Sequence, residues 1–171
     1  MTLIPLISLR ASTEIKSYLD YGGNDGRTDW LAYGFDDSLW QPPVFGGRNA
    51  GDEPYPDGAE GINAPGASWG HWHYFRHKFV ILSGDVPSLP DPLQIVTSAD
   101  DHAYYYLDGT LLGETLYGNW HHPIAVPSLV AGNHILCVKN DGGMLYGAYA
   151  TWSFVQSGGL AARLAFKLVI S

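Results

Sequence analysis

The stretch at residues 93–109, LQIVTSADDHAYYYLDG, decides the fold class of this chain. Residues 93–98 are rich in apolar and β-branched side chains, and residues 103–107 form an aromatic run, so both predict β-strands. Asp108 and Gly109 then predict a tight hairpin turn, because both residue types tolerate positive φ. The stretch is expected to run strand, acidic turn, strand, tight turn and strand, which is typical of antiparallel β proteins.

Short strands are expected along most of the chain, at a spacing typical of an antiparallel β-sandwich or jelly roll. Helical periodicity is nearly absent, and the best helix candidate is a single turn at residues 36–40, capped by Asp36 or Asp37. The Gly- and Pro-rich residues 46–70 are expected to form one long loop, either a binding loop or a passive crossover between sheets. The expected strands are residues 6–9, 13–19, 72–81, 93–98, 103–107, 110–114, 123–125, 134–140, 144–155 and 161–171.

The strand expected at residues 72–81 gives a prediction for individual side chains. Neighbouring residues in a strand point to opposite faces of the sheet. Phe75, Phe79 and Ile81 therefore share one face with His73 and His77, whereas Trp72, Tyr74, Arg76 and Lys78 share the other. We expect these two cations to face solvent or a partner.

The composition is that of one globular domain with few cations. The chain has 171 residues, nine of them Lys or Arg, and a formal net charge of −8. This charge argues against binding to nucleic acid and to anionic membranes. Residues 1–12 are assigned to an N-terminal arm or first strand, and residues 13–171 to the domain. The single cysteine, Cys137, cannot form an internal disulfide and is expected in the core.

The first residues, MTLIPLISLRAS, do not have the features of a targeting segment. They lack a basic stretch, and Pro5 interrupts a short apolar run, so we expect neither a signal peptide nor a membrane span. A protein with exposed binding loops and no such signal fits a place on a virion or another extracellular surface.

Several stretches together resemble the galactose-binding-like jelly-roll domain, which occurs in many carbohydrate-binding modules. The resemblance covers roughly residues 15–170 and implies two packed antiparallel sheets, with ligands bound by loops at one end of the sandwich. The same fold hosts many unrelated functions. The matching stretches are GFDDSLWQPP at residues 34–43, YFRHKF at 74–79, ADDHAYYYLDG at 99–109, LVAGNHIL at 129–136, NDG at 140–142 and GGLAARL at 158–164.

An aromatic loop at residues 117–122 is the best candidate for a binding surface. Aromatic faces stack on sugar rings, and amide and imidazole groups bond to sugar hydroxyls, but the same residues also anchor protein partners. The long loop offers Tyr55 and Trp69 as a second candidate surface. The candidates in residues 117–122 are Tyr117, Asn119, Trp120, His121 and His122.

Calcium is the one ion that the sequence suggests. Asp25 and Asp29 lie in an oxygen-rich loop, and Asp100 and Asp101 form the acidic turn. The carboxylates of Asp100 and Asp101 either bind a structural calcium or hold their turn by accepting backbone N–H bonds. Some members of the resembled family hold calcium in comparable loops. We expect no transition metal and no other cofactor, because no set of three ligands has a diagnostic spacing.

The sequence predicts a binding protein instead of an enzyme, because no nucleophile or phosphate-loop motif is present. The first hypothesis is an external virion protein, either a capsid decoration (cement) protein or a tail or receptor-binding component. It is expected to form a homo-oligomer, most plausibly a trimer, whose partners are protein subunits or glycans. The alternative is a lectin-like glycan-binding module that accompanies a glycoside hydrolase. A hydrolase is the remote third hypothesis.

Overall fold

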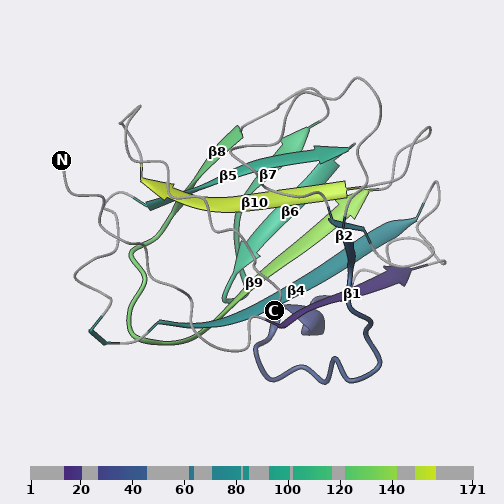
Figure 1. Cartoon of the computed structure of the whole chain (residues 1–171), viewed down its shortest axis with the longest axis horizontal. Helices are drawn as coiled ribbons and strands as arrows, with labels where there is room; N and C mark the ends of the chain where they lie inside the picture. Colours follow the sequence, from purple (N-terminus) through teal and green to yellow (C-terminus); the bar gives the residue numbers. More distant parts are fainter. Residues whose placement is uncertain are drawn as a thin grey trace.

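In the part of the chain that the structure describes, two five-stranded antiparallel sheets pack face to face as a β-sandwich (Figure 1). The computed structural model describes residues 14–20, 27–45, 62–63, 71–81, 83–84, 93–100, 102–116, 122–141 and 149–156. Sheet A contains, in spatial order, β1 (Glu14–Asp20), β4 (Trp72–Ile81), β9 (Gly132–Asp141), β6 (His102–Leu107) and β7 (Thr110–Leu116). Sheet B contains β2 (Val44–Phe45), β3 (Ile62–Asn63), β10 (Tyr149–Gln156), β5 (Leu93–Asp100) and β8 (His122–Val126). The all-β sandwich expected from the sequence is confirmed.

The observed strands lie close to the expected ones. β4 has the expected bounds, and β7 continues two residues beyond its expected end. Two short strands, β2 and β3, were not expected. β3 lies inside residues 46–70, so the prediction of a loop without strands was wrong at Ile62–Asn63. The arm at residues 1–12 and the expected strand at residues 161–171 lie outside the described residues.

The hairpin turn between β6 and β7 forms as predicted. Asp108 and Gly109 have φ values of 48° and 83°. The Asp108 side chain also fixes the turn to β9, because Oδ1 accepts the backbone N–H of Ile135 at 2.9 Å and Oδ2 lies 2.7 Å from His134 Nδ1. The connection between β5 and β6 is not a hairpin. These two strands belong to different sheets, so the acidic stretch between them links the two layers.

The main core lies between the sheets. It joins Phe75 and Phe79 of β4 to Ile95 of β5 and Ile124 of β8, and all four are almost fully buried. His73 and His77 are buried as well, as the alternation along β4 predicts. Burial lowers the pKa of His77 to about 4, because a low-dielectric interior disfavours the charged imidazolium.

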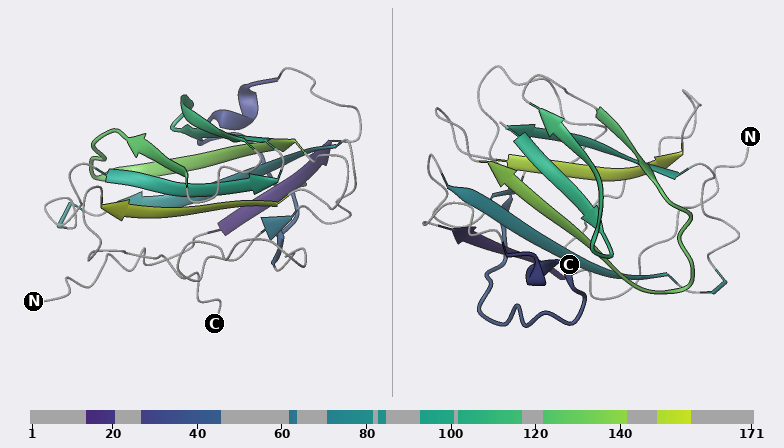
Figure 2. Two further views of the ribbon diagram at one scale, coloured as in Figure 1. Left: turned by 90° about the horizontal axis from the view of Figure 1, so that it is seen from above. Right: turned by 180° about the vertical axis from the view of Figure 1, so that it is seen from behind.

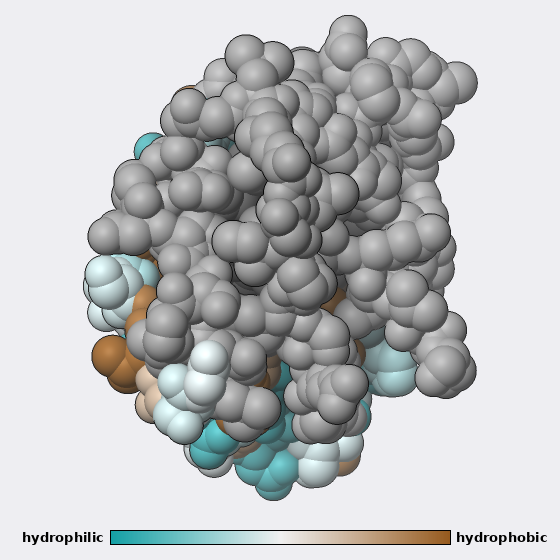
Figure 3. All heavy atoms as spheres, turned by 60° about the vertical axis from the view of Figure 1, so that its left-hand side comes forward, coloured by the Kyte–Doolittle hydropathy of each residue, from teal (hydrophilic) through white to brown (hydrophobic). Residues whose placement is uncertain are grey.

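The outer face of sheet A is also covered. Residues 27–41, here named the covering segment, carry the 3-10 helix η1 (Asp29–Leu31) and cross this face on the side away from sheet B (Figure 2). A second cluster forms there around Trp30, Tyr74, Ile135 and Cys137. Cys137 is fully buried, as expected. Among the coloured residues of Figure 3, small hydrophobic areas are interspersed with hydrophilic ones.

Candidate functional site

The covering segment is held on sheet A by a buried arginine. The prediction that Arg76 faces solvent or a partner was wrong, because its side chain is fully buried. Arg76 Nε lies 2.9 Å from Asp37 Oδ2, and Nη1 donates to the carbonyl of Ala32 at 3.0 Å and to that of Trp30. A buried charge is tolerated only when it is paired and hydrogen-bonded, and the covering segment supplies both kinds of partner.

A second cation and two aromatic rings complete this attachment. Lys78 Nζ also lies 2.9 Å from Asp37 Oδ2. Partial burial alone would raise the pKa of Asp37, but the hydrogen bonds and charges of Arg76 and Lys78 outweigh it and hold that pKa below its usual range. The Arg76 guanidinium lies 5.0 Å from the ring centroid of Phe35 and 5.9 Å from that of Trp40. The cation therefore fixes the rings of the covering segment as well as its backbone.

Local hydrogen bonds shape the covering segment itself. Asp29 Oδ1 accepts the backbone N–H of Trp30 at 3.1 Å. Asp36 Oδ1 accepts that of Ser38 at 3.0 Å, and hydrogen bonds from Ser38 lower the pKa of Asp36. The helical turn expected at residues 36–40 is instead a turn closed by Trp40 N–H and the Asp37 carbonyl, at 3.0 Å. The short helix of this segment is η1, nearer its start.

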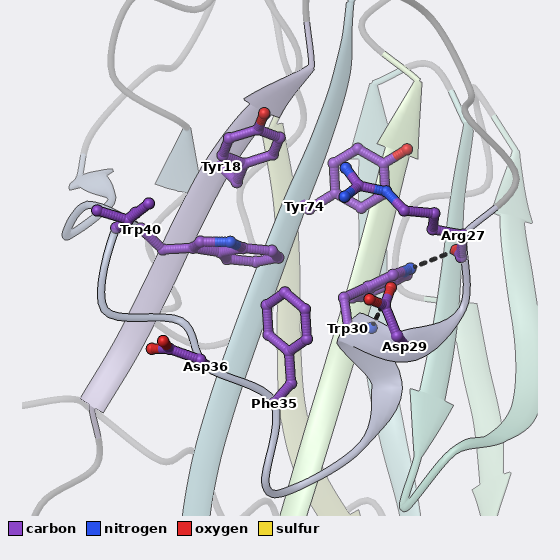
Figure 4. A pocket seen from close by; sticks show the side chains of 9 residues that line it. Tyr18, Arg27, Asp29, Trp30, Phe35, Asp36, Trp40 and Tyr74 are labelled. Carbon is purple, nitrogen blue, oxygen red and sulfur yellow. Dashed lines mark hydrogen bonds between the residues drawn. The ribbon is translucent and has the colours of Figure 1, made fainter.

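A pocket of about 210 Å³ opens between the covering segment and strands β1 and β4 (Figure 4). Its wall is mostly aromatic. Arg27 and Asp29 lie on one side of the pocket in Figure 4, and Asp36 lies on the other. The remaining lining residues are Tyr18, Trp30, Phe35, Leu39, Trp40 and Tyr74.

The aromatic rings that line the pocket are tilted at different angles to one another. Tyr74 of β4 is buried, with Trp30 edge-on to it at 5.1 Å between ring centroids and 82° between planes. Trp40 lies at 65° to Tyr74, and Phe35 lies at 69° to Trp40. Only Tyr18 and Trp40 stack nearly parallel, at 5.4 Å and 23°. These rings form walls around a small space and not a flat surface.

The residues that the sequence suggested for binding mostly lie outside the described residues. This holds for Tyr55, Trp69, Tyr117, Asn119, Trp120 and His121, and for the calcium candidates Asp25 and Asp101. His122 is described: it is the half-buried first residue of β8, and its carbonyl accepts the Thr97 hydroxyl at 3.0 Å. Asp100 ends β5.

Asp29 is the one predicted site residue that the structure places at the pocket. Its Oδ1 accepts the backbone N–H of Trp30, the second residue of η1. Among the described residues, no group of three or more His, Cys, Asp or Glu side chains could hold a metal ion.

The sequence interpretation missed the aromatic pocket. Tyr18, Trp40 and Tyr74 come from three separate parts of the chain, and each alone resembles an ordinary core aromatic. A signal was present in the covering segment, where DWLAYGFDDSLW at residues 29–40 combines four aromatic with three acidic residues. That density is unusual for a segment that lies outside the expected strands.

Comparisons with known proteins bear on the fold alone. No family model and no curated protein matches the chain. A solved structure of a calcium-binding mutant of Bacteroides uniformis beta-glucuronidase 2 has a TM-score of 0.51 and 17% identity, over 84% of this chain and 18% of that one. An uncultured Clostridium sp. beta-glucuronidase has a TM-score of 0.48 and 15% identity, over 81% of this chain and 27% of that one. The sandwich therefore resembles a small part of a much longer protein.

No helix among the described residues is long and apolar enough to cross a membrane.

Proposed function

We propose that this chain is a non-catalytic carbohydrate-binding module with a galactose-binding-like jelly roll, of the kind that accompanies a glycoside hydrolase. The observation that carries the proposal is the aromatic pocket with Arg27, Asp29 and Asp36 at its rim. Aromatic faces pack on the apolar faces of sugar rings, while carboxylates and a guanidinium bond to hydroxyl groups. The likeness of the sandwich to part of a beta-glucuronidase supports the same proposal.

Three described side chains, two carboxyl groups and one thiol, lack the pKa values that a catalytic role would require of them. Glycoside hydrolysis needs one carboxyl group that stays protonated near neutral pH, with a raised pKa. The pKa values of Asp36 and Asp37 are both lowered. Burial raises the pKa of Cys137 to about 12, so its thiol is a poor nucleophile.

The accessory-module hypothesis takes precedence over the virion hypothesis. Both were drawn from the sequence, and both use exposed aromatic residues. The comparisons contain glycoside hydrolases and give no support to a virion role or to a particular oligomeric state. A structural calcium and a homo-oligomer remain predictions for direct measurement.

A glycan array with two matched tyrosine variants tests the proposal. Tyr18 and Tyr33 are exposed to the same degree, 40% and 39%, but only Tyr18 lines the pocket. We expect wild-type protein to bind glycans on the array. Tyr18→Ala should weaken that binding about tenfold, or about 1.4 kcal/mol, and Tyr33→Ala should leave it unchanged.

Two results would overturn the proposal. The first is wild-type protein that binds no glycan on the array while its thermal unfolding is cooperative. The second is hydrolysis of nitrophenyl glycosides by purified protein, in proportion to its concentration, which would contradict the non-catalytic role.

A further inference from the structure

We propose that the pocket takes the single terminal ring of a neutral glycan, end-on, instead of binding an internal stretch of a sugar chain. This inference rests on the proposed function and specifies its ligand. Three observations carry it: the angles between the rings, the volume of the pocket and the charges at its rim (Figure 4).

The ring angles do not provide a platform for a chain. A glycan that binds along its length needs exposed rings in one plane, so that successive sugars stack on successive rings. Around this pocket, Trp30 and Trp40 stand at 82° and 65° to Tyr74. Phe35 stands at 69° to Trp40. Rings at these angles surround one sugar and leave no flat path to the next.

The volume agrees with a ligand the size of one ring. The pocket holds about 210 Å³. Pockets that enclose drug-sized molecules hold roughly 300–1,000 Å³. Leu39, whose side chain is 91% exposed, lines the pocket without being part of any buried cluster. It offers apolar surface at the pocket entrance, where the second sugar of a bound glycan would extend out of the pocket.

The rim suits hydroxyl groups better than a sugar carboxylate. One oxygen of Asp29 and one of Asp36 accept backbone N–H bonds, so both carboxylates are held in place with further acceptor sites available. Arg27 is the only cation that lines the pocket among the described residues. One cation opposite two carboxylates gives no excess of positive charge for an acidic sugar. The cations beneath the rings, Arg76 and Lys78, are paired with Asp37.

Titration calorimetry with sugars of increasing length tests this inference. The probes are the methyl glycosides of glucose, galactose, mannose, xylose, N-acetylglucosamine and glucuronic acid, with the disaccharide to hexasaccharide of each neutral sugar that binds. We expect one neutral sugar to bind as its methyl glycoside, and the hexasaccharide to gain less than about threefold in affinity. Methyl glucuronide should bind at least tenfold more weakly.

Two variants locate the binding site. Leu39→Ser changes the pocket entrance, and Val130→Ser is the matched control, because Val130 is 65% exposed and does not line the pocket. Leu39→Ser should weaken binding of the methyl glycoside about threefold or more, whereas Val130→Ser should not change it. Neither change should shift the thermal midpoint by more than a few degrees, because both side chains are exposed.

The outcomes separate this inference from the proposed function. Affinity that rises tenfold or more from the monosaccharide to the hexasaccharide would overturn end-on binding and leave a carbohydrate-binding module. Binding that is unchanged by both Tyr18→Ala and Leu39→Ser would overturn this pocket as the binding site. A carbohydrate-binding module would again remain. Preference for methyl glucuronide would overturn the neutral-ligand assignment. Failure of every sugar to bind would overturn both proposals.

Discussion

Both faces of sheet A are covered, the inner one almost fully and the outer one in part, and the structures that cover them differ. The inner face packs on sheet B, and Phe75, Ile95 and Ile124 meet there with exposures of 5% or less. The outer face is covered by residues 27–41, which have little regular structure of their own. Its contacts are a paired arginine, aromatic rings at steep angles and a cysteine under η1.

This difference between the two faces explains why a pocket forms on the outer face of sheet A. Two regular sheets bury apolar side chains in continuous contact and fill the space between them. An irregular segment reaches the sheet only where its own turns bring it close, so space is left between those points. The aromatic pocket lies in such a space, and its shape depends on the Arg76–Asp37 pair that holds the covering segment in place.

Removal of a large side chain from the inner face should have the largest effect. Phe75 is fully buried between the sheets. We expect Phe75→Ala to lower the free energy of unfolding by about 3–5 kcal/mol, because it leaves a cavity in a closely packed core. Urea denaturation followed by circular dichroism measures this. A loss below 1 kcal/mol would mean that the inner face is not the main source of stability.

Loss of the buried arginine should open the outer face specifically. After Arg76→Ala, Lys78 is the one cation among the described residues that still pairs with Asp37, and we expect the free energy of unfolding to fall by about 3 kcal/mol. The single thiol, Cys137, reports the opening, because it lies buried with Sγ 3.7 Å from the Trp30 carbonyl. We expect a disulfide reagent to label Cys137 at least tenfold faster in Arg76→Ala than in wild type.

The dependence on urea separates local opening from global unfolding. Labelling through release of the covering segment exposes little surface, so its rate should change little with urea. Labelling in Phe75→Ala should rise steeply with urea instead. Lys78→Ala is the control, since this partly exposed cation should contribute less than about 1 kcal/mol. An equal, steep urea dependence in both variants would show that the two faces unfold together.

The difference between the two faces also explains which features of the structure could be predicted from the sequence. The bounds of β4 and the turn at Asp108 and Gly109 follow from alternation and turn chemistry, which depend only on near neighbours in the chain. Alternation also placed Arg76 on the face opposite Phe75, but it cannot say what covers that face. The burial of Arg76 depends on Asp37, 39 residues away, and such a contact leaves no periodic signal.

The candidate site was hidden for the same reason. Tyr18, Trp40 and Tyr74 are brought together by the pairing of β1 with β4 and by the path of the covering segment. The loop aromatics that the sequence favoured, Tyr117 and Trp120, lie outside the described residues and stay a prediction. Residue type alone indicates that an aromatic can bind a sugar, whereas tertiary contacts decide which aromatics surround a space.

Acid should weaken the inner face before the outer one. The pKa of His77 is about 4 in the folded protein and about 6.5 in an unfolded chain. Above pH 6.5 both states are neutral; between pH 6.5 and 4 the unfolded chain takes up a proton that the folded protein does not. Folding stability should therefore fall by up to about 3 kcal/mol as the pH drops through this window.

The variant His77→Phe isolates this effect. It should reduce the loss of stability between pH 6.5 and 4 in urea titrations at fixed pH. Asp37 behaves differently, because its lowered pKa means that its contribution is present above its ordinary value of 3.8 and is lost as the pH falls through the folded value. An unchanged slope between pH 6.5 and 4 in His77→Phe would contradict the assignment to His77.

The smallest effect expected is at the β6–β7 turn, which belongs to neither buried face. An alanine at Gly109 meets no atom within 4 Å, so any cost comes from the backbone, whose φ of 83° L-residues seldom adopt. We expect Gly109→Ala to lower the free energy of unfolding by about 1 kcal/mol. Gly84→Ala is the matched control, because Gly84 has equal space and its φ lies outside the strained range. That change should be neutral or slightly stabilising, since alanine restricts the unfolded chain. Equal losses in both variants would mean that an added methyl group, and not the left-handed backbone of the turn, is responsible.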